Sequence, residues 1–169
     1  MKNLRWGLIG FGDAGENFYK DLKLRKISEL KNICSKSRFR ELKKIFFDID
    51  ITDNYDESIE KTNVDIVYIS LINSLHYEYL KKAIKSNKHI LIEKPACIDF
   101  EEIKDIRKDI YKNKNIYFKE AILYLNHPLI KNIYEISNNE NIGKIIKIKS
   151  EYGFNFKKKK FLFFLKKKK

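Results

Sequence analysis

The sequence is poor in cysteine, and its apolar residues never form a long uninterrupted run. Its two cysteines, Cys34 and Cys97, are too few for a disulfide framework and do not belong to a zinc-binding pattern, so we expect two buried free thiols and no metal. No stretch approaches the roughly 20 apolar residues of a membrane-spanning helix. Glycines interrupt the first apolar run before it reaches the length of a signal peptide. These absences favour a cytoplasmic protein.

Acidic residues are few beside the basic ones: 23 Asp and Glu against 36 Lys and Arg give a formal net charge of +13. The excess is concentrated in residues 157–169, which hold eight lysines and no acid and leave +5 for residues 1–156. This tail contains only Lys, Phe and Leu. We interpret it as low-complexity readthrough of an A/T-rich tract; binding to nucleic acid or to an anionic membrane surface is the alternative that its charge allows.

Hydrophobic residues at 43% and aromatic residues at 14% are enough for a core, which excludes wholesale disorder. Along residues 1–119, short apolar runs alternate with segments whose apolar residues recur at helical spacing. This order indicates an α/β fold with a doubly wound parallel sheet that has helices on both faces. The expected strands are Trp6–Ile9, Leu30–Cys34, a brief one around Ile51, Ile66–Ile69, His89–Ile92 and Ile116–Phe118. Asp99 is expected to cap a helix, with Glu102 three residues on.

After Lys119 the pattern changes. Pro128 stands where a helix is expected to begin, and Leu129, Ile133 and Ile136 give that helix an apolar stripe. Residues 146–156 alternate strictly between apolar and polar side chains, which predicts a strand with one buried and one wet face. That strand would belong to a different, open sheet and would lack a partner, so we also expect self-association through it.

Residues 10–15 read Gly-Phe-Gly-Asp-Ala-Gly, a G-x-G-x-x-G motif that follows an expected strand and opens an expected helix. Gly10 permits a tight turn, Gly12 lets the backbone approach a pyrophosphate, and Gly15 lets helix and strand pack closely. The N–H groups and the dipole at the helix start favour phosphates. We therefore predict a Rossmann-type dinucleotide site that includes Phe11 and Ala14; a glycine turn without a ligand is the alternative.

The end of the second expected strand lacks the acidic residue that binds the adenosine ribose in NAD-dependent proteins. Ser35, Lys36, Ser37 and Arg38 stand there instead, and Glu29 lies before the strand, at the wrong end of the sheet. Two hydroxyls and two cations suit a 2′-phosphate, so NADP is preferred over NAD. The alternative is that the two cations are ordinary solvated charges.

Three motifs together resemble the Gfo/Idh/MocA family, the relatives of glucose–fructose oxidoreductase and inositol dehydrogenase. They are the glycine motif, Asn73-Ser74-Leu75-His76, and Glu93-Lys94-Pro95, the last being the most specific. The resemblance runs from about Leu4 to Phe156. It implies an oxidoreductase that transfers a hydride between a nicotinamide and a hydroxyl-bearing carbon of a sugar, cyclitol or related polyol.

The resemblance also assigns roles to residues. Lys94 would be catalytic, orienting the reacting carbon and stabilising negative charge on a substrate oxygen. Asn73, His76 and Glu93 would line the nicotinamide ribose, and Glu120 would also belong to the cofactor site. Pro95 would lie in a constrained, often cis, turn. Taken alone, His76 also reads as a helix-start cap and Lys94 as a surface lysine.

The chain departs from the family pattern in several places. It has Leu71-Ile72 where the family usually has Thr-Pro, and Leu125 where many relatives have an arginine. The family's substrate domain continues beyond one helix and one strand to a later helix with a histidine, whereas His127 stands before Pro128. We therefore expect a dinucleotide domain at 1–119, the start of a truncated α+β substrate domain at 120–156 and the tail at 157–169. The alternative function is a truncated nucleotide-binding protein without turnover.

Overall fold

The computed structural model describes residues 3–139, 143–151 and 153, and the chain divides into two units, residues 1–123 and 124–169. Six short strands of the first unit pair in parallel, in the order β3-β2-β1-β4-β5-β6. This order is that of a doubly wound Rossmann-type sheet, which confirms the expected fold class. The strands are β1 (Leu4–Ile9), β2 (Ser28–Cys34), β3 (Asp50–Thr52), β4 (Ile66–Ile69), β5 (His89–Ile92) and β6 (Phe118–Glu120).

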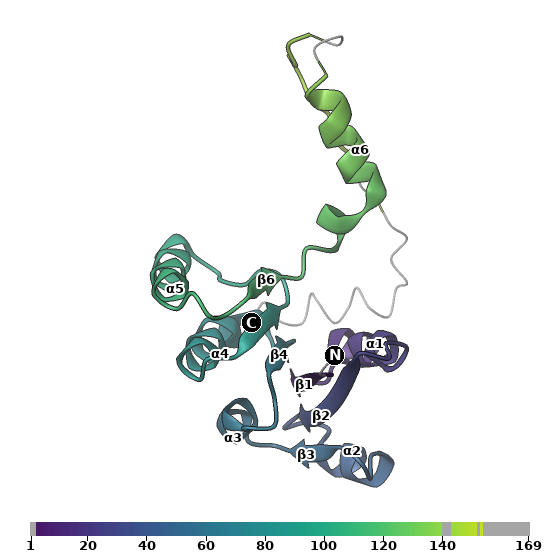
Figure 1. Ribbon diagram of the computed structural model, residues 1–169, viewed down its shortest axis with the longest axis vertical. Helices are drawn as coiled ribbons and strands as arrows, with labels where there is room; N and C mark the ends of the chain where they lie inside the picture. The colour runs from purple at the N-terminus through teal and green to yellow at the C-terminus, as the bar shows by residue number, and fades with distance from the viewer. Residues whose placement is uncertain (1–2, 140–142, 152, 154–169) are drawn as a thin grey trace, which may run out of the picture. The chain divides into compact units, whose positions relative to one another are not determined.

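Helices cover both faces of this sheet, as Figure 1 shows with α1 and α2 on one side and α3, α4 and α5 on the other. Side chains alternate between the two faces along each strand, so Val67 and Ile69 of β4 join one core cluster while Tyr68 joins the other. The helices are α1 (Asp13–Lys23), α2 (Phe39–Ile45), α3 (Tyr55–Glu60), α4 (Asn73–Lys85) and α5 (Phe100–Lys112).

Local capping chemistry fixes the start of α5. The Asp99 carboxylate accepts a hydrogen bond from the Glu102 N–H at 2.9 Å, which confirms the expected cap of α5. The Glu102 carboxylate in turn accepts from the Ile98 N–H at 2.9 Å, one residue before the position that a capping box predicts. The bond from the Glu102 N–H satisfies one of the backbone donors that a helix start leaves without partners, and the bond from the Ile98 N–H ties the preceding residue to the first turn.

Two elements differ from expectation. Helix α3 was not anticipated, because its six residues are mostly polar and carry too little periodicity; Asn54 caps it by accepting from the N–H groups of Asp56 and Glu57. Strand β6 begins at Phe118, two residues later than its apolar run. Ile116 is buried in the segment that joins α5 to β6, and pairing with β5 starts only where Phe118 lies opposite Ile90.

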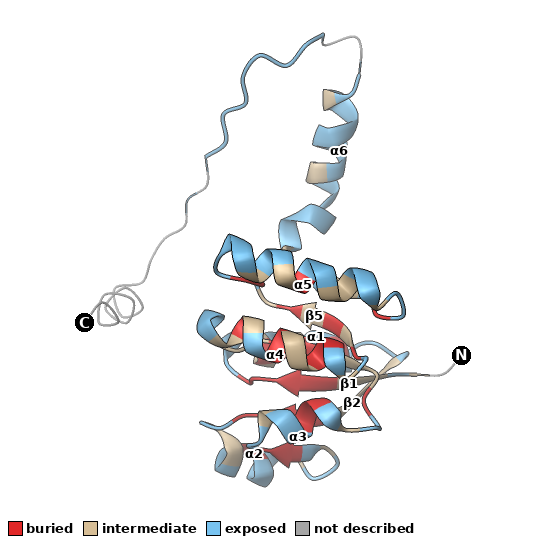
Figure 2. Ribbon diagram, turned by 90° about the vertical axis from the view of Figure 1, so that its left-hand side faces the viewer, coloured by how far each residue is buried: buried red, intermediate tan, exposed pale blue. Residues whose placement is uncertain are grey.

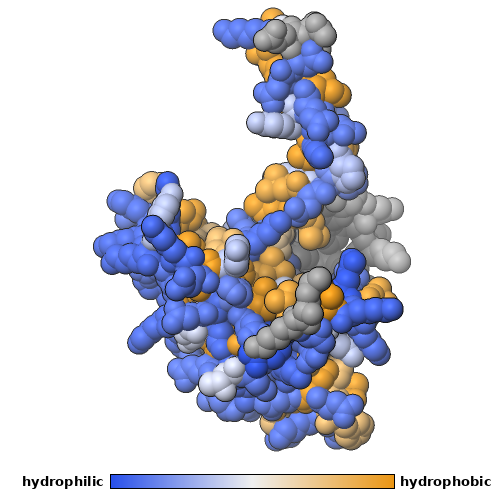
Figure 3. Space-filling model, in the orientation of Figure 1, coloured by the Kyte–Doolittle hydropathy of each residue, from blue (hydrophilic) through white to orange (hydrophobic). Residues whose placement is uncertain are grey.

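The second unit contains helix α6 (Pro128–Ser137), preceded by the 3-10 turn η1 (Leu123–Asn126) that spans the boundary between the units. Pro128 begins α6 as expected, and the His127 ring caps it by accepting from the Leu129 N–H. The apolar stripe of α6 is exposed in the described chain, as the pale blue in Figure 2 and the mixed orange and blue in Figure 3 show.

The strand expected at residues 146–156 is wrong for the part that the structure describes: residues 146–151 and 153 have no strand. Ile146 and Ile148 are 97% and 79% exposed, so the alternation does not bury one face. A strand needs a paired neighbour to satisfy its backbone groups, and this segment has none among the described residues. The remainder of the expected strand and the tail lie outside the described residues. None of the described helices is both long enough and apolar enough to cross a membrane.

Candidate functional site

The centre of the sheet is its topological switch point, because β1 leads to a helix on one face and β4 to a helix on the other. Ligands of open α/β sheets bind outside the carboxyl ends of the strands at such a point. Backbone bonds hold these ends in register: the Ser70 N–H donates to the Ile9 carbonyl at 2.8 Å, and the Glu93 N–H donates to the Ile69 carbonyl at 2.9 Å. The expected motifs on β1, β4 and β5 therefore share one edge.

The glycine motif forms the turn from β1 into α1. Gly10 has φ +99°, and a Cβ there would lie 2.7 Å from the Ser70 carbonyl oxygen. A Cβ on Gly15 would lie 2.7 Å from the Gly10 carbonyl oxygen, so strand and helix approach too closely for a side chain. A Cβ on Gly12 would meet no atom within 4 Å. Gly12 is the N-cap of α1, so this open space lies at a helix N-terminus, where a dinucleotide pyrophosphate fits.

Phe11 and Ala14 contribute to this turn in different ways. The Phe11 side chain is only 4% exposed and packs edge-on against Phe46, with ring centroids 6.0 Å apart. Its ring therefore belongs to the core, and its backbone is what the turn presents. Ala14 is half-buried in the first turn of α1.

Arg38, just after β2, connects the end of this strand to the glycine turn. Its guanidinium donates to the Phe11 carbonyl at 3.2 Å and to the Glu16 carboxylate of α1 at 3.1 Å. It also pairs with Glu41 at 2.6 Å. These contacts raise the pKa of Arg38, with the hydrogen bond to Glu41 as the largest cause, and hydrogen bonds from Lys20 and Arg38 lower the pKa of Glu16. The composition marked Arg38 only as a nearby cation, whereas the structure connects it to the turn.

The other residues at the end of β2 differ in exposure. Ser35 is 3% exposed, and its hydroxyl oxygen accepts from the Arg38 N–H at 3.3 Å, so it holds the turn. Lys36 and Ser37 are exposed. The Lys36 ammonium lies 4.8 Å from the centre of the Tyr55 ring. Lys36 and Ser37 are thus the two groups of this set that solvent or a ligand reaches readily.

At the end of β4, the two expected ribose-lining residues have different surroundings. Asn73 is exposed at the first position of α4. His76 is fully buried, with Nδ1 2.7 Å from the Pro95 carbonyl oxygen and Nε2 3.0 Å from the Leu71 carbonyl oxygen. The structure gives His76 no exposed atom for a ribose contact, because both ring nitrogens face backbone carbonyls. Its burial could not be read from helical position alone.

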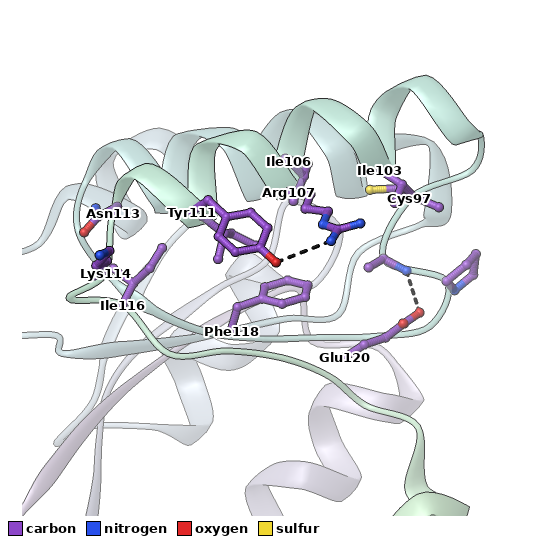
Figure 4. A pocket seen from close by; sticks show the side chains of 13 residues that line it. Cys97, Ile103, Ile106, Arg107, Tyr111, Asn113, Lys114, Ile116, Phe118 and Glu120 are labelled. Carbon is purple, nitrogen blue, oxygen red and sulfur yellow. Dashed lines mark hydrogen bonds between the residues drawn. The ribbon is translucent and has the colours of Figure 1, made fainter.

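The turn after β5 carries Glu93, Lys94 and Pro95. The Lys94–Pro95 peptide bond is cis, as the resemblance implies. The Glu93 carboxylate accepts a hydrogen bond from the Tyr68 hydroxyl at 2.5 Å. Lys94 is exposed and has no ion-pair partner in the described part of the chain. The Glu120 carboxylate accepts from the Ala96 N–H at 2.9 Å, so Glu120 contacts the turn (Figure 4).

A cavity of about 710 Å³ lies between α5 and β6, beside this turn (Figure 4). Most of its lining is apolar, from Ile103, Ile106 and Phe118, and Glu120 lies at one end. The Gly10–Gly15 turn does not line it, so this cavity is separate from the switch point. Among residues 3–139, 143–151 and 153, no cluster of His, Cys, Asp or Glu could hold a metal ion.

Comparison with known proteins adds independent findings. Residues 4–121 match the model of an oxidoreductase family with an NAD-binding Rossmann fold, Gfo/Idh/MocA. The chain is 26% identical over 148 residues to a dTDP-3,4-didehydro-2,6-dideoxy-alpha-D-glucose 3-reductase of Actinomadura kijaniata, covering 84% of this chain and 43% of that protein. It is 24% identical over 166 residues to an NADP(+)-dependent D-xylose 1-dehydrogenase of Hypocrea jecorina, covering 90% of this chain and 42% of that protein.

Among solved structures, scyllo-inositol dehydrogenase from Lactobacillus casei with bound NAD(H) and scyllo-inositol has the same fold, with a TM-score of 0.76 at 19% identity. The match covers 84% of this chain and 43% of that one. The chain thus spans less than half the length of these relatives. The family match covers most of this chain, and the sheet order and the glycine turn of the chain agree with the Rossmann fold of that family. The chain belongs to the Gfo/Idh/MocA family of oxidoreductases.

Proposed function

We propose that this chain binds a nicotinamide dinucleotide at the switch point and serves an NAD(P)-dependent oxidoreductase. The reaction would transfer a hydride between the nicotinamide and a hydroxyl-bearing carbon of a sugar, cyclitol or related polyol. The observation that carries the proposal is the glycine turn. Gly10 and Gly15 cannot carry a side chain without a clash, whereas Gly12 faces open space at the start of α1. The pyrophosphate is the ligand group that this combination suits.

The substrate class is supported by the relatives, whose names specify sugar or cyclitol chemistry. When bound, the nicotinamide supplies the carbon that accepts or donates a hydride. The residues of this chain bind the dinucleotide and orient the substrate beside the nicotinamide. Helix α1 directs N–H groups to the phosphates, and the exposed Lys94 ammonium stabilises negative charge on a substrate oxygen in the transition state. Asn73 and Glu93 offer polar groups at the same edge of the sheet for ribose hydroxyls.

We favour NADP over NAD. No carboxylate follows β2 within the Ser35–Arg38 segment, and Lys36 and Ser37 are exposed there. Arg38 lies between this segment and the glycine turn, where it contacts the Phe11 carbonyl. A 2′-phosphate on the adenosine ribose would meet these cations and hydroxyls, whereas a 2′-hydroxyl would find no acidic acceptor among them.

Titration of the chain with NADPH and with NADH, followed by the fluorescence of the reduced nicotinamide, tests the binding. We expect both to bind and NADPH to bind more tightly. Adenosine 2′,5′-bisphosphate should displace NADPH, since it carries the 2′-phosphate without the nicotinamide. Binding of neither dinucleotide would refute the proposed site, and tighter binding of NADH would refute the preference.

A second assay addresses the reaction. The chain is incubated with NADP(+) and a panel of sugars and cyclitols, and the absorbance of reduced nicotinamide is followed. Turnover with any of them supports the oxidoreductase function in this chain. Dinucleotide binding without turnover on the whole panel would support the alternative of a nucleotide-binding protein without turnover.

A further inference from the structure

The turn at residues 93–96 is held by side chains from three separate elements. Tyr68 of β4 bonds the Glu93 carboxylate, His76 of α4 contacts the Pro95 carbonyl, and Glu120 of β6 accepts from the Ala96 N–H. These three partners lie between 19 and 25 residues away along the chain. Lys94, in the middle of the turn, is its one charged residue without an ion pair or hydrogen-bond partner in the described chain, and its side chain is exposed.

The Tyr68 contact is the one that bears on a ligand. Tyr68 is 3% exposed, and burial, with the hydrogen bond to Glu93 as the second cause, raises its pKa. Its hydroxyl therefore remains a donor across the neutral range. A carboxylate has two oxygens that accept only. Tyr68 occupies Oε1 of Glu93, and no other side chain of the described residues bonds this carboxylate, so Oε2 is left for an outside donor.

Tyr68 also connects this turn to the helix that follows the glycine motif. Its ring packs on Phe18 of α1, with ring centroids 4.3 Å apart and planes 33° apart. The ring of Tyr68 is thus packed against α1 on one side, and its hydroxyl is directed to Glu93 in the turn after the neighbouring strand, β5. A rigid ring of this kind places the carboxylate without the entropic cost of ordering it when a ligand binds.

The other two contacts fix the backbone of the turn. His76 connects it to the turn after β4, because its second nitrogen lies 3.0 Å from the Leu71 carbonyl. A neutral imidazole donates to one of these two carbonyls and a protonated imidazole to both. The Glu120 carboxylate holds the 9%-exposed Ala96 at the other end of the turn.

We propose that Tyr68, His76 and Glu120 are positioning residues that fix the turn 93–96, and that Tyr68 directs Glu93 at a hydroxyl of the bound dinucleotide. This inference rests on the proposed function for its ligand and on the three contacts for its geometry. It gives His76 and Glu120 a role different from direct cofactor contact. Binding groups held by neighbouring side chains keep the close geometry that a ligand site needs.

The ligand half of the proposal is tested with Tyr68→Phe, which removes only the hydroxyl. Tyr77→Phe is the matched control, because the Tyr77 hydroxyl also donates to a carboxylate, that of Asp105 at 2.7 Å, away from the turn. We expect Tyr68→Phe to weaken NADPH binding roughly threefold to tenfold, the cost of ordering one side chain when a ligand binds, and Tyr77→Phe to leave it unchanged. In a Glu93→Ala background, Tyr68→Phe should have no further effect. Equal affinities of the two Phe variants, or an undiminished loss in the Glu93→Ala background, would overturn this role.

The geometric half is tested without any ligand, by amide hydrogen exchange of the turn in the ligand-free chain. Tyr68→Phe, His76→Phe and Glu120→Ala should each accelerate exchange at residues 93–97, whereas Glu120→Gln should restore protection of the Ala96 amide, since its side-chain oxygen still accepts. Unchanged exchange in all three variants would overturn the proposal. If NADPH failed to bind the unmodified chain, the proposed function and the ligand half would fall, while exchange would still decide whether the three residues fix the turn.

Discussion

Gly12 is the residue whose substitution best separates the fold from the ligand site. Gly12→Ala adds one methyl group at a position with φ −84°, which any L-residue adopts, and with no atom within 4 Å of the new Cβ. Loss of a glycine N-cap costs about 0.5–1 kcal/mol. Alanine also lowers the conformational entropy of the unfolded chain relative to glycine, which stabilises the folded state by about 0.4–1 kcal/mol. The free energy of unfolding should therefore change by no more than about 0.5 kcal/mol.

The neighbouring glycines provide the contrast. In Gly15→Ala, the new Cβ would lie 2.7 Å from the Gly10 carbonyl oxygen and 3.0 Å from the Ser70 hydroxyl oxygen. Forcing a methyl group into such a contact costs about 1–3 kcal/mol. In Gly10→Ala, the new Cβ would lie 2.7 Å from the Ser70 carbonyl oxygen, and the backbone at φ +99° would add strain of about 1–3 kcal/mol to the cost of that contact. Either loss is a large part of the stability of about 5–15 kcal/mol that folded proteins have.

Binding should respond in a different way from stability. The methyl group that Gly12→Ala adds would occupy the space proposed for the pyrophosphate, so NADPH affinity should fall at least tenfold, about 1.4 kcal/mol. Urea unfolding, followed by the fluorescence of Trp6, measures the stability of each variant, and an NADPH titration measures its affinity. The reasoning would be refuted if Gly12→Ala bound NADPH as tightly as the unmodified chain, or if it were destabilised as strongly as Gly15→Ala.

Three further predictions concern the cofactor, pH and a helix cap. Lys36→Ala should weaken NADPH binding several-fold more than NADH binding, because only NADPH carries the 2′-phosphate, and equal weakening in parallel titrations would contradict the preference. Burial raises the pKa of the Cys34 thiol to about 12 and of Cys97 to about 11, from an ordinary 9.0, so the folded chain keeps protons that the unfolded chain loses. The free energy of unfolding, measured in urea, should therefore be unaffected by these thiols below pH 9.0 and should fall as the pH rises toward about 12. Cys34→Ala should reduce that fall. An identical pH dependence in this variant would contradict a raised pKa of the Cys34 thiol. Asp99→Ala should lower the free energy of unfolding by about 1 kcal/mol through loss of the bond to the Glu102 N–H, and an unchanged thermal midpoint would count against the cap.

The sheet was predictable where a strand is a short apolar run bounded by turns or helices, whereas β3 (Asp50–Thr52) and β6 (Phe118–Glu120) are short and partly polar and gave weaker signals. The runs at β4 and β5 match the observed strands residue for residue. The short α3 escaped because Ser58 and Ile59 are its only buried residues; the Asn54 cap with acids in the first turn was the signal that could have found it. The alternation at residues 146–151 misled because periodicity describes a strand's faces and not whether another strand pairs with it.

The spacing of the motifs predicted that the turns after β1, β4 and β5 share one edge of the sheet, which the structure confirms, but it did not predict what surrounds each side chain. Sequence spacing assigned His76 to the start of a helix, but its partner Pro95 is 19 residues away, and only the packed fold reveals that contact. The same holds for Arg38, whose bond to Glu16 crosses 22 residues, and for Tyr68, which the sequence marked only as part of a buried strand.

The central claim is that a nicotinamide dinucleotide binds at the carboxyl edge of β1, β4 and β5. Titration of the ¹⁵N-labelled chain with NADPH, followed by backbone amide NMR, tests this claim most directly. The account predicts that the largest shifts fall on the amides of residues 10–15, with further shifts at residues 36–38 and 93–96. Amides at residues 10–15 that remain unmoved at saturating NADPH would contradict it.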